Sequence, residues 1–418
     1  MTPIVDLRGR EILDSRGRPT VEATCLLKSG AFGTASVPSG ASTGTAEAQE
    51  LRDGDAARYR GLGCRRAAAN IGGPIREAII GKSFADQNAL DEALLDLNSK
   101  QRESTLGANA LLAVSLAYAR ATAAELGVPL YRHFADMLGE PLRTLPRLTI
   151  NLFSGGKHAG GQVPIQDVLI VPVSAKTIDE SLATAFAVYQ SAADLTRDKY
   201  GTRALSADEG GLAPPFPSVN AMFADAVDAI RAAGFEPGKE VALAVDVASS
   251  HFFRDGRYYF SDSPLSSLQM IDTIENWLNE FPIISVEDGL AEDDWQHWPV
   301  LRQRISDRAL VLGDDLLCTN PERIRRAVET QAANALLLKV NQIGTLSKAA
   351  ESLRLARQAG WRVTVSARSG ETEDNWLADL AVGWSGDQIK VGSITQSERL
   401  AKYNRLLAIE SETNLPIV

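Results

Sequence analysis

The segment ALLLKVNQIGTLSKAAESLRLARQAGWRVTVSARSG, residues 335–370, contains two apolar runs separated by an amphipathic stretch. The runs at 334–340 and 361–367 are short and strongly apolar, as buried strands are, and residues 346–360 have the apolar spacing of a helix. Buried strands that alternate with helices are typical of a parallel sheet that helices cover. The segment therefore predicts one strand-helix-strand unit.

The same pattern occurs six times in succession in the second part of the chain. The expected strands lie at 240–246, 282–288, 309–315, 334–340, 361–367 and 387–392. Two further strands near 147–153 and 167–172 bring the number to about eight. This number favours an α/β fold with a closed (β/α)8-like barrel. A doubly wound open sheet is the alternative, although the usual glycine-rich dinucleotide turn is missing after the first strand.

The first part of the chain has a different pattern. Residues 1 to about 60 alternate short β-like runs with turns, and residues from about 85 to 137 have a helical pattern, in which one helix ends at Gly127. The small residues of SGASTG, 39–44, predict a mobile lid loop, with a plain flexible loop as the alternative. We therefore expect an N-terminal α+β domain over 1–137 and the barrel over 138–418.

The composition excludes several classes of protein. The chain has 418 residues, of which 44% are apolar and 23% charged, as in ordinary globular proteins. Its formal charge of -10 argues against general nucleic-acid binding. No long apolar run predicts a membrane span, and charges occur too early for a signal peptide. Three scattered cysteines without a CxxC motif suit a reducing compartment, so we expect a cytoplasmic location.

Six of the expected strands end in a charged residue. These residues are Asp246, Glu287, Asp314, Lys339, Arg368 and Lys390. Each has an ordinary structural interpretation, such as a turn cap or a solvated loop acid. The C-terminal strand ends of a barrel, however, meet at one mouth, where active sites form. Three carboxylates on separate strands suit Mg²⁺, and the absence of a Cys/His cluster argues against zinc.

Lys339 follows four apolar residues and is expected to point into the barrel. Desolvation and neighbouring cations both lower the pKa of a lysine, which would make Lys339 a general base. A structural ion pair with one of the three acids is the alternative, and the residues leave the two interpretations equally open. Arg368 and Lys390 are expected to hold an anion, because arginine can bind phosphate or carboxylate through two parallel hydrogen bonds.

Two glycine-rich loops add candidate groups. SADEGGLAPP, 206–215, places the acid Glu209 before two glycines, and SGGKHAGG, 154–161, places His158 among glycines. A lone histidine is more often structural than catalytic, but one with glycines close on both sides packs little. A metal-bound carboxylate, a lysine base and an opposed acid would together remove a proton α to a carboxylate and help a leaving group depart.

The chain resembles enolase, phosphopyruvate hydratase, over nearly its whole length. The segments that carry the resemblance are DSRGRPTVE, VPSGASTG, ELRDGD, LGANALLAVSLA, DEGGLAP, ISVEDGLAEDDW, GDDLLCTNP, LLLKVNQIGTLS, RSGETED and SERLAKYNRLL. The resemblance implies an N-terminal α+β capping domain, an enolase-type C-terminal barrel and a homodimer or higher homo-oligomer. It also implies dehydration of 2-phosphoglycerate to phosphoenolpyruvate with two Mg²⁺ ions.

The resemblance assigns roles residue by residue. Asp246, Glu287 and Asp314 would bind the first Mg²⁺. Lys339 would be the base and Glu209 the acid. The residues expected to hold substrate are Arg368, Ser369 and Lys390, with Gln166 and His158 beside it. Ser39 on the lid would reach the second Mg²⁺.

Three departures from the family pattern lie on the leaving-group and phosphate side. Ala367 stands where the family has an active-site histidine, and Asp167 replaces a glutamate at a catalytic position, about one methylene shorter. Lys157 replaces a small residue before His158 and adds positive charge for substrate binding. Because the metal ligands and Lys339 are retained, we expect a working paralogue with altered chemistry or a larger anionic substrate.

One known enolase paralogue fits this direction of change. Carboxyphosphonoenolpyruvate synthase of phosphonate-antibiotic pathways combines a three-carbon unit derived from 2-phosphoglycerate with phosphonoformate. The second anion would need space and positive charge near the phosphate site. The alternatives are an ordinary glycolytic enolase, another enol-phosphonate lyase, and a non-catalytic binding or structural protein.

Overall fold

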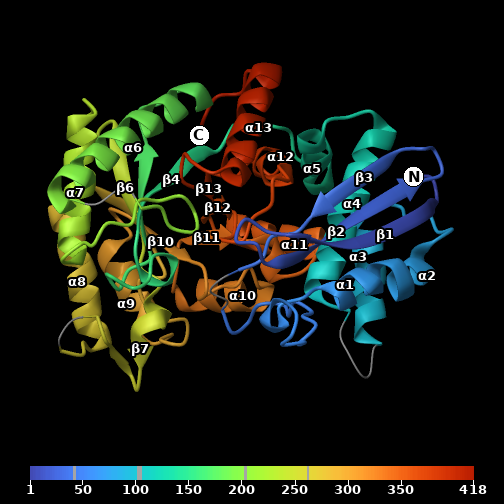
Figure 1. Ribbon diagram of the computed structural model, residues 1–418, viewed down its shortest axis with the longest axis horizontal. Coiled ribbons are helices and arrows are strands. Elements are labelled where there is room, and N and C mark those ends of the chain that lie inside the picture. Colours follow the sequence, from blue (N-terminus) through green and yellow to red (C-terminus); the bar gives the residue numbers. More distant parts are fainter. Residues whose placement is uncertain (41–43, 101–105, 202–204, 261–262) are drawn as a thin grey trace.

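The computed structural model describes residues 1–40, 44–100, 106–201, 205–260 and 263–418. Its two parts lie side by side in Figure 1, with the blue N-terminal sheet and its helices on the right and the barrel with its helices on the left. Residues 41–43 of the expected lid loop lie outside the described residues.

The N-terminal sheet is antiparallel, with the strand order β1 (Ile4–Leu13), β2 (Pro19–Leu27) and β3 (Phe32–Ser36). Alternate residues of β2 are buried, among them Val21, Ala23 and Cys25. Helix α4 (Ala108–Leu126) packs against β2 and β3. Almost every side chain of α4 is buried, because the sheet, α3, α5 and the edge of the barrel surround it.

The other N-terminal helices continue this layer. They are η1 (Tyr59–Gly61), α1 (Arg65–Asn70), η2 (Ile71–Ile75), α2 (Arg76–Ile79), α3 (Gln87–Ser99) and α5 (Leu130–Leu138). The expected helix end at Gly127 is confirmed, since Gly127 is the C-cap of α4 in the left-handed region at φ 66°. Helix α5 ends one residue beyond the expected domain boundary at 137, and that boundary stays a prediction.

Eight strands close into a barrel in the order β10-β11-β12-β13-β4-β5-β6-β9. The strands are β4 (Arg147–Ser154), β5 (Asp167–Pro172), β6 (Val241–Asp246), β9 (Ile283–Glu287), β10 (Leu310–Gly313), β11 (Ala335–Leu338), β12 (Arg362–Ser366) and β13 (Gln388–Gly392). The expected α/β barrel is thus confirmed, and the open doubly wound sheet is wrong.

One strand departs from the expected parallel arrangement. Strand β5 pairs antiparallel with both β4 and β6, while the other six pairs around the barrel are parallel. The loop between β4 and β5, residues 155–166, contains only the short helix η3 (Gly156–His158) and no crossover helix. A parallel pair needs such a crossover, so the chain turns back and β5 runs against β4. The start of β5, at Asp167, therefore lies where the other strands end.

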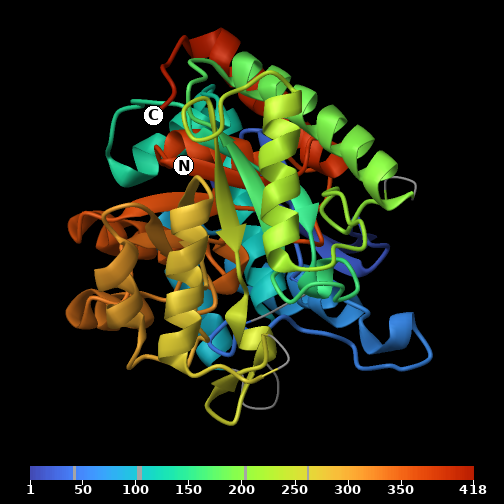
Figure 2. The same cartoon turned by 90° about the vertical axis from the view of Figure 1, so that its left-hand side faces the viewer.

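Helices cover the outside of the barrel. They are α6 (Ile178–Tyr200), α7 (Val219–Ala232), α8 (Ser267–Glu280), α9 (Trp298–Ile305), α10 (Pro321–Thr330), α11 (Leu346–Gln358), α12 (Trp376–Gly383) and α13 (Ser397–Thr413). Figure 2 shows the green-to-yellow helices α6 to α8 in front of the strands. Short elements after β6, namely η4 (Ser249–Phe252), β7 (Phe253–Arg254) and β8 (Arg257–Tyr258), extend the loop before α8.

No single helix among the described residues is long and apolar enough to span a membrane. Helices α4 and α5 meet that test only as a pair, and the pair is bent by 104°.

The contact between β3 and α4 leads to a prediction about stability. A Cβ at Gly33 would overlap the Ala117 carbonyl and the Ala121 amide of α4. We expect Gly33→Ala to lower the free energy of unfolding by about 1–3 kcal/mol, as overpacking does. Gly72→Ala is the matched control, because nothing lies within 4 Å of a Cβ there. Equal unfolding midpoints for the two variants in denaturant would contradict this packing.

Candidate functional site

Charged side chains gather at the mouth of the barrel, the end where the seven parallel strands finish. Asp246 and Glu287 are register partners on neighbouring strands β6 and β9, and Asp167 at the start of β5 is the partner of Asp246 on the other side. Lys390 lies on β13, and Lys339 directly follows β11. The barrel therefore brings together strand ends that are far apart in the sequence.

Two lysines neutralise the carboxylates at the mouth. Lys390 Nζ lies 2.9 Å from Asp246 Oδ2 and 2.7 Å from Glu287 Oε2. Lys339 Nζ forms an ion pair with Asp314. All five side chains are buried or nearly so, so each charge depends on its partners for compensation.

A histidine and two acids form a second group at the mouth. His158 Nδ1 lies 3.0 Å from Asp167 Oδ2, and His158 Nε2 lies 3.9 Å from Glu209 Oε1. Burial alone would lower the pKa of His158, but Asp167, Glu209 and Asp246 outweigh it and raise that pKa to about 9. Burial would raise the pKa of Glu209, but His158 and the nearby cations, among them Lys390 and Lys339, bring it below its ordinary value. Burial raises the pKa of Asp167 above its ordinary value, although His158 opposes this shift. Between His158 and Glu209, the surrounding charges favour the proton on His158.

Residues of both groups line a small cavity of about 20 Å³. By the same measure one water molecule needs about 10–15 Å³. The cavity is lined by His158, Gln166, Glu209, Asp246, Lys339, Ser366, Ala367, Arg368, Ser369 and Lys390. The lining is polar apart from Ala367, and it contains both acids and cations. Acidic and basic groups around one small cavity can move protons to and from a small anion bound there.

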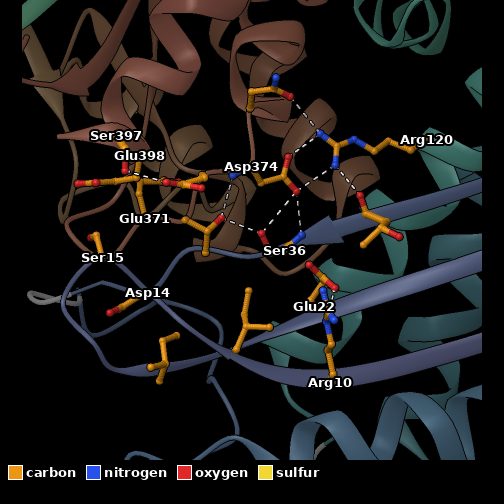
Figure 3. A pocket seen from close by; sticks show the side chains of 16 residues that line it. Arg10, Asp14, Ser15, Glu22, Ser36, Arg120, Glu371, Asp374, Ser397 and Glu398 are labelled. Atoms are coloured by element: carbon orange, nitrogen blue, oxygen red, sulfur yellow. Dashed lines mark hydrogen bonds and ion pairs between the residues drawn. The ribbon is translucent and has the colours of Figure 1, made fainter. Parts of the chain in front are cut away.

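A larger groove, of about 790 Å³, lies elsewhere, between the N-terminal sheet and the segments around 371–375 and 397–398 of the barrel. Its two arginines are both paired with acids of the groove: Figure 3 shows Asp374 between Arg120 and Ser36, and Arg10 beside Glu22. The groove contains none of the strand-end charges. We therefore place the candidate active site in the smaller cavity at the barrel mouth.

Two family models match the chain. The model described as enolase, N-terminal domain, matches residues 4–134, and the one described as enolase, C-terminal TIM barrel domain, matches residues 142–415. The chain belongs to the enolase family. Its domains are those of an enolase-superfamily enzyme, and its buried acidic groups could bind a metal ion.

The oxygen donors at the mouth of this enolase-family barrel fit a hard cation. Glu287 Oε1 and Gln166 Oε1 are buried and have no hydrogen-bond partner among the described residues. Burial, followed by repulsion from Asp246, raises the pKa of Glu287 well above its ordinary value, so negative charge is under-compensated there. Mg²⁺ prefers oxygen ligands, and a cation bound here would compensate the negative charge. Asp246, Glu287 and Asp314 as ligands stay a prediction.

The expected low pKa of Lys339 is wrong for this arrangement. Burial does lower the pKa of Lys339, but the adjacent Asp314 carboxylate outweighs both burial and the repulsion from Arg368. The net direction is upward, so the ammonium form is favoured. Of the two interpretations left open by the sequence, the ion pair describes the structure, and the role as a base stays a prediction.

Arg368 binds a carboxylate from the N-terminal part of the chain. Its Nη1 and Nη2 lie 3.1 and 3.0 Å from the two carboxylate oxygens of Glu47, and Nη1 donates to Asn341 Oδ1 at 2.9 Å. The sequence did not indicate Glu47. Ser369 lines the cavity beside Arg368, and its Oγ accepts a hydrogen bond from Arg16 at 3.0 Å.

Two of the expected site residues, Ser39 and Lys157, do not line the cavity. Ser39 forms a β-bridge with Gly370, but its Oγ accepts from Arg52 at 2.7 Å and donates to Glu50 at 3.2 Å. In this structure Ser39 is thus bonded to charged residues of its own segment. Lys157 is exposed and does not line the cavity, because η3 turns only His158 inward. The roles of Ser39 and Lys157 stay predictions.

Two further acids, Asp288 and Asp315, were not among the expected site residues. Asp288 accepts the amides of Asp314 at 2.9 Å and Asp315 at 2.8 Å, and these three carboxylates lie close enough to hold a metal ion. Asp314 and Asp315 are buried, so the alternative of solvated loop acids is wrong. The signal was the doubled acid at two strand ends, VED and GDD.

The metal ligands can be tested by calorimetry. We expect Asp246→Ala, Glu287→Ala and Asp314→Ala each to weaken Mg²⁺ binding at least about tenfold, or about 1.4 kcal/mol, because three oxygen ligands cannot easily become two. Asp293→Ala is the matched control, since this exposed acid lies in the loop after β9. Unchanged affinity in any of the three variants would remove that residue from the ligand set.

Proposed function

We propose that this enolase-family enzyme uses Mg²⁺ to remove the α-proton of 2-phosphoglycerate, or of a close analogue, and then eliminates across C2–C3. The product is an enol phosphate or phosphonate. The proposal rests on one observation: Lys339 and the pair His158 and Glu209 line the same cavity, beside the carboxylate Asp246. A base and an acid that line one cavity suit the removal of a proton and of a hydroxide from adjacent carbons.

We assign the role of each residue from its place at the barrel mouth and from the family pattern. Asp246, Glu287 and Asp314 would hold the first Mg²⁺, and Ser39 a second ion that arrives with substrate. A bound cation supplies charge stabilisation for the ene-diolate that forms when the α-proton leaves. Arg368, Ser369 and Lys390 would hold the substrate anion, with Gln166 beside them.

Substrate binding has to rearrange side chains. The cavity has room for about one water molecule, while its walls hold the ion pairs of Lys390 with Asp246 and of Arg368 with Glu47. An incoming phosphate competes with these carboxylates for the cations. The proposed site is therefore one in which ligand charges replace protein charges.

We propose carboxyphosphonoenolpyruvate synthesis, with phosphonoformate as second substrate, as the specific reaction. The support is Ala367, a small side chain that lines the cavity at the position where the family has a histidine. Atom balance requires that joining 2-phosphoglycerate and phosphonoformate into this product releases one orthophosphate and one water. An ordinary enolase releases water alone.

The second candidate is an ordinary glycolytic enolase. It is supported by the residues that this chain keeps from the family pattern, namely the three candidate metal ligands, Lys339, Glu209, Arg368 and Lys390. For either reaction we propose a cytoplasmic homodimer or higher homo-oligomer that acts on small anions. The net charge of -10 supports the absence of nucleic-acid partners.

Proton abstraction can be measured separately from elimination. We expect Lys339→Ala to slow exchange of the C2 proton of 2-phosphoglycerate with deuterium by roughly 10²–10⁴-fold, the usual contribution of a positioned base. NMR in D₂O follows the exchange, and Lys348→Ala on the outer helix α11 is the control. Exchange at the wild-type rate in Lys339→Ala would refute the assignment of Lys339.

The specific reaction is tested by ³¹P NMR. With 2-phosphoglycerate alone we expect phosphoenolpyruvate to form slowly, about 10²–10³-fold below an ordinary enolase, since a lost hydrogen-bond donor costs about that much. Phosphonoformate should start the release of orthophosphate together with a new phosphorus signal. Ala367→His should suppress that signal by filling the cavity. Brisk conversion of 2-phosphoglycerate without any effect of phosphonoformate would favour ordinary enolase.

A further inference from the structure

The short segment after β12 carries two of the expected anion-binding side chains and is anchored by its backbone. We call residues 368–372 the anion segment; Arg368 and Ser369 of this segment line the cavity. Each backbone carbonyl of the anion segment accepts a hydrogen bond from a residue that does not line the cavity. A carbonyl oxygen that faced the cavity would repel a bound anion. These carbonyls are instead bonded outside it.

The N-terminal part of the chain holds the middle of the anion segment. The amide of Ser39 donates to the Gly370 carbonyl at 2.8 Å, and the amide of Ser15 donates to the Glu371 carbonyl at 2.7 Å. Gly370 fits here because it has no side chain, since a Cβ would lie 2.2 Å from Asp14 Oδ2. Both hydrogen bonds come from backbone amides, so they do not depend on the side chains of Ser39 and Ser15.

Helix α13 holds the two ends of the anion segment through side chains. Arg399 Nη1 donates to the Arg368 carbonyl and Nη2 to the Ser369 carbonyl, both at 2.6 Å. Lys402 Nζ donates to the Thr372 carbonyl, also at 2.6 Å. Arg399 and Lys402 are three positions apart, and residues with that spacing are neighbours on the surface of a helix. One face of α13 therefore carries both contacts.

Both cations are buried although neither lines the cavity. Arg399 is 0% exposed and Lys402 is 1% exposed. Lys402 Nζ lies 2.8 Å from Glu371 Oε2, and Oε1 of the same carboxylate accepts the amide of Arg368 at 3.1 Å. Arg399 Nε lies 3.3 Å from Glu398 Oε1. The planar guanidinium of arginine presents donors in a rigid fork, which the single ammonium of a lysine cannot reproduce.

Arg399 also contacts the neighbouring strand end. The register between β12 and β13 ends at the pair Ser366 and Lys390. One residue further, the Val391 carbonyl accepts a second hydrogen bond from Arg399 Nη1, at 3.1 Å. The guanidinium thus connects the backbone beside Lys390, the third expected anion-binding residue, to the backbone of the anion segment.

We propose that Arg399 and Lys402 are positioning residues, which fix the backbone of the anion segment so that Arg368 and Ser369 present their side chains to a small phosphate-bearing anion. This role rests on the proposed function, in which Arg368 and Ser369 hold the substrate anion. Neither Arg399 nor Lys402 touches that anion. They act through the carbonyls that they bind, and a helix outside the barrel thereby sets the geometry of the anion site.

Inorganic phosphate is the probe, because its binding does not require any reaction. Titration of the ¹⁵N-labelled protein, followed by the amide signals of the anion segment, measures the affinity at this place. We expect Arg399→Met and Lys402→Met each to weaken phosphate binding roughly tenfold, the effect of about one hydrogen bond to a charged group. Arg399→Lys keeps the charge but not the forked donors, so we expect it to weaken binding nearly as much as Arg399→Met.

Tyr403→Phe is the matched control. Tyr403 lies on the same helix, is 1% exposed, and its hydroxyl donates to the Gly392 carbonyl at 2.9 Å. The variant therefore loses one buried hydrogen bond from α13 to a carbonyl outside the anion segment. We expect a lower unfolding midpoint in denaturant and an unchanged phosphate affinity. An equal loss of affinity in Tyr403→Phe would show that any loosening of α13 suffices, and would overturn the positioning role.

The remaining outcomes are equally decisive. Wild-type phosphate affinity in a folded Met variant would remove that residue from the positioning set, and full recovery in Arg399→Lys would show that charge alone is needed. If Arg399→Met fails to fold, Arg399→Lys and Lys402→Met decide. A wild type that does not bind phosphate at the anion segment would overturn the inference. A wild type that binds phosphate there but shows no C2 exchange would refute the proposed function and leave the positioning role intact.

Discussion

Charge compensation at the barrel mouth is the interaction on which the rest of the structure depends. Moving one ion from water into a protein interior costs several kcal/mol, so a buried carboxylate needs a cation or a set of donors. Lys390 forms ion pairs with both Asp246 and Glu287, and Lys339 forms one with Asp314. Removing one of these lysines would leave buried acids uncompensated. The strand ends therefore form one electrostatic unit, in which the state of each group is set by its neighbours.

The reversed direction of strand β5 places Asp167 and His158 beside these charged strand ends. In a fully parallel barrel the first residue of a strand lies at the far end from the mouth. Because β5 runs against its neighbours, its first residue, Asp167, is level with the last residue of β6, Asp246. The loop that makes the reversal also carries His158 on η3. A short connection without a crossover helix thus supplies one wall of the site.

The sequence predicts the barrel well because its signals are local. Apolar runs of strand length, each followed by an amphipathic stretch, identify the elements, and a charged residue at the end of a buried run identifies the mouth. The direction of β5 could not be predicted this way, since an apolar run has the same pattern in both directions. The same holds for pairings such as Glu47 with Arg368, which join residues 321 positions apart.

The protonation state of Lys339 could not be predicted from the sequence for a related reason. The apolar residues before Lys339 do predict burial, and burial alone would lower its pKa. What decides the outcome is the position of Asp314, which lies on the next strand end and forms an ion pair with Lys339. The identity of a residue fixes its ordinary pKa, whereas the shift depends on distances that only the folded chain defines.

The pair of Glu47 and Arg368 connects substrate binding to the N-terminal part of the chain. A guanidinium binds a carboxylate or a phosphate through two parallel N–H donors, and here Nη1 and Nη2 of Arg368 both point to Glu47. A second anion can take both donors only if Glu47 releases them. Glu47 also accepts from Gln342, whose amide donates to Asp314 at 2.9 Å. Displacement of this one carboxylate therefore changes the surroundings of the anion-binding arginine and of a candidate metal ligand at the same time.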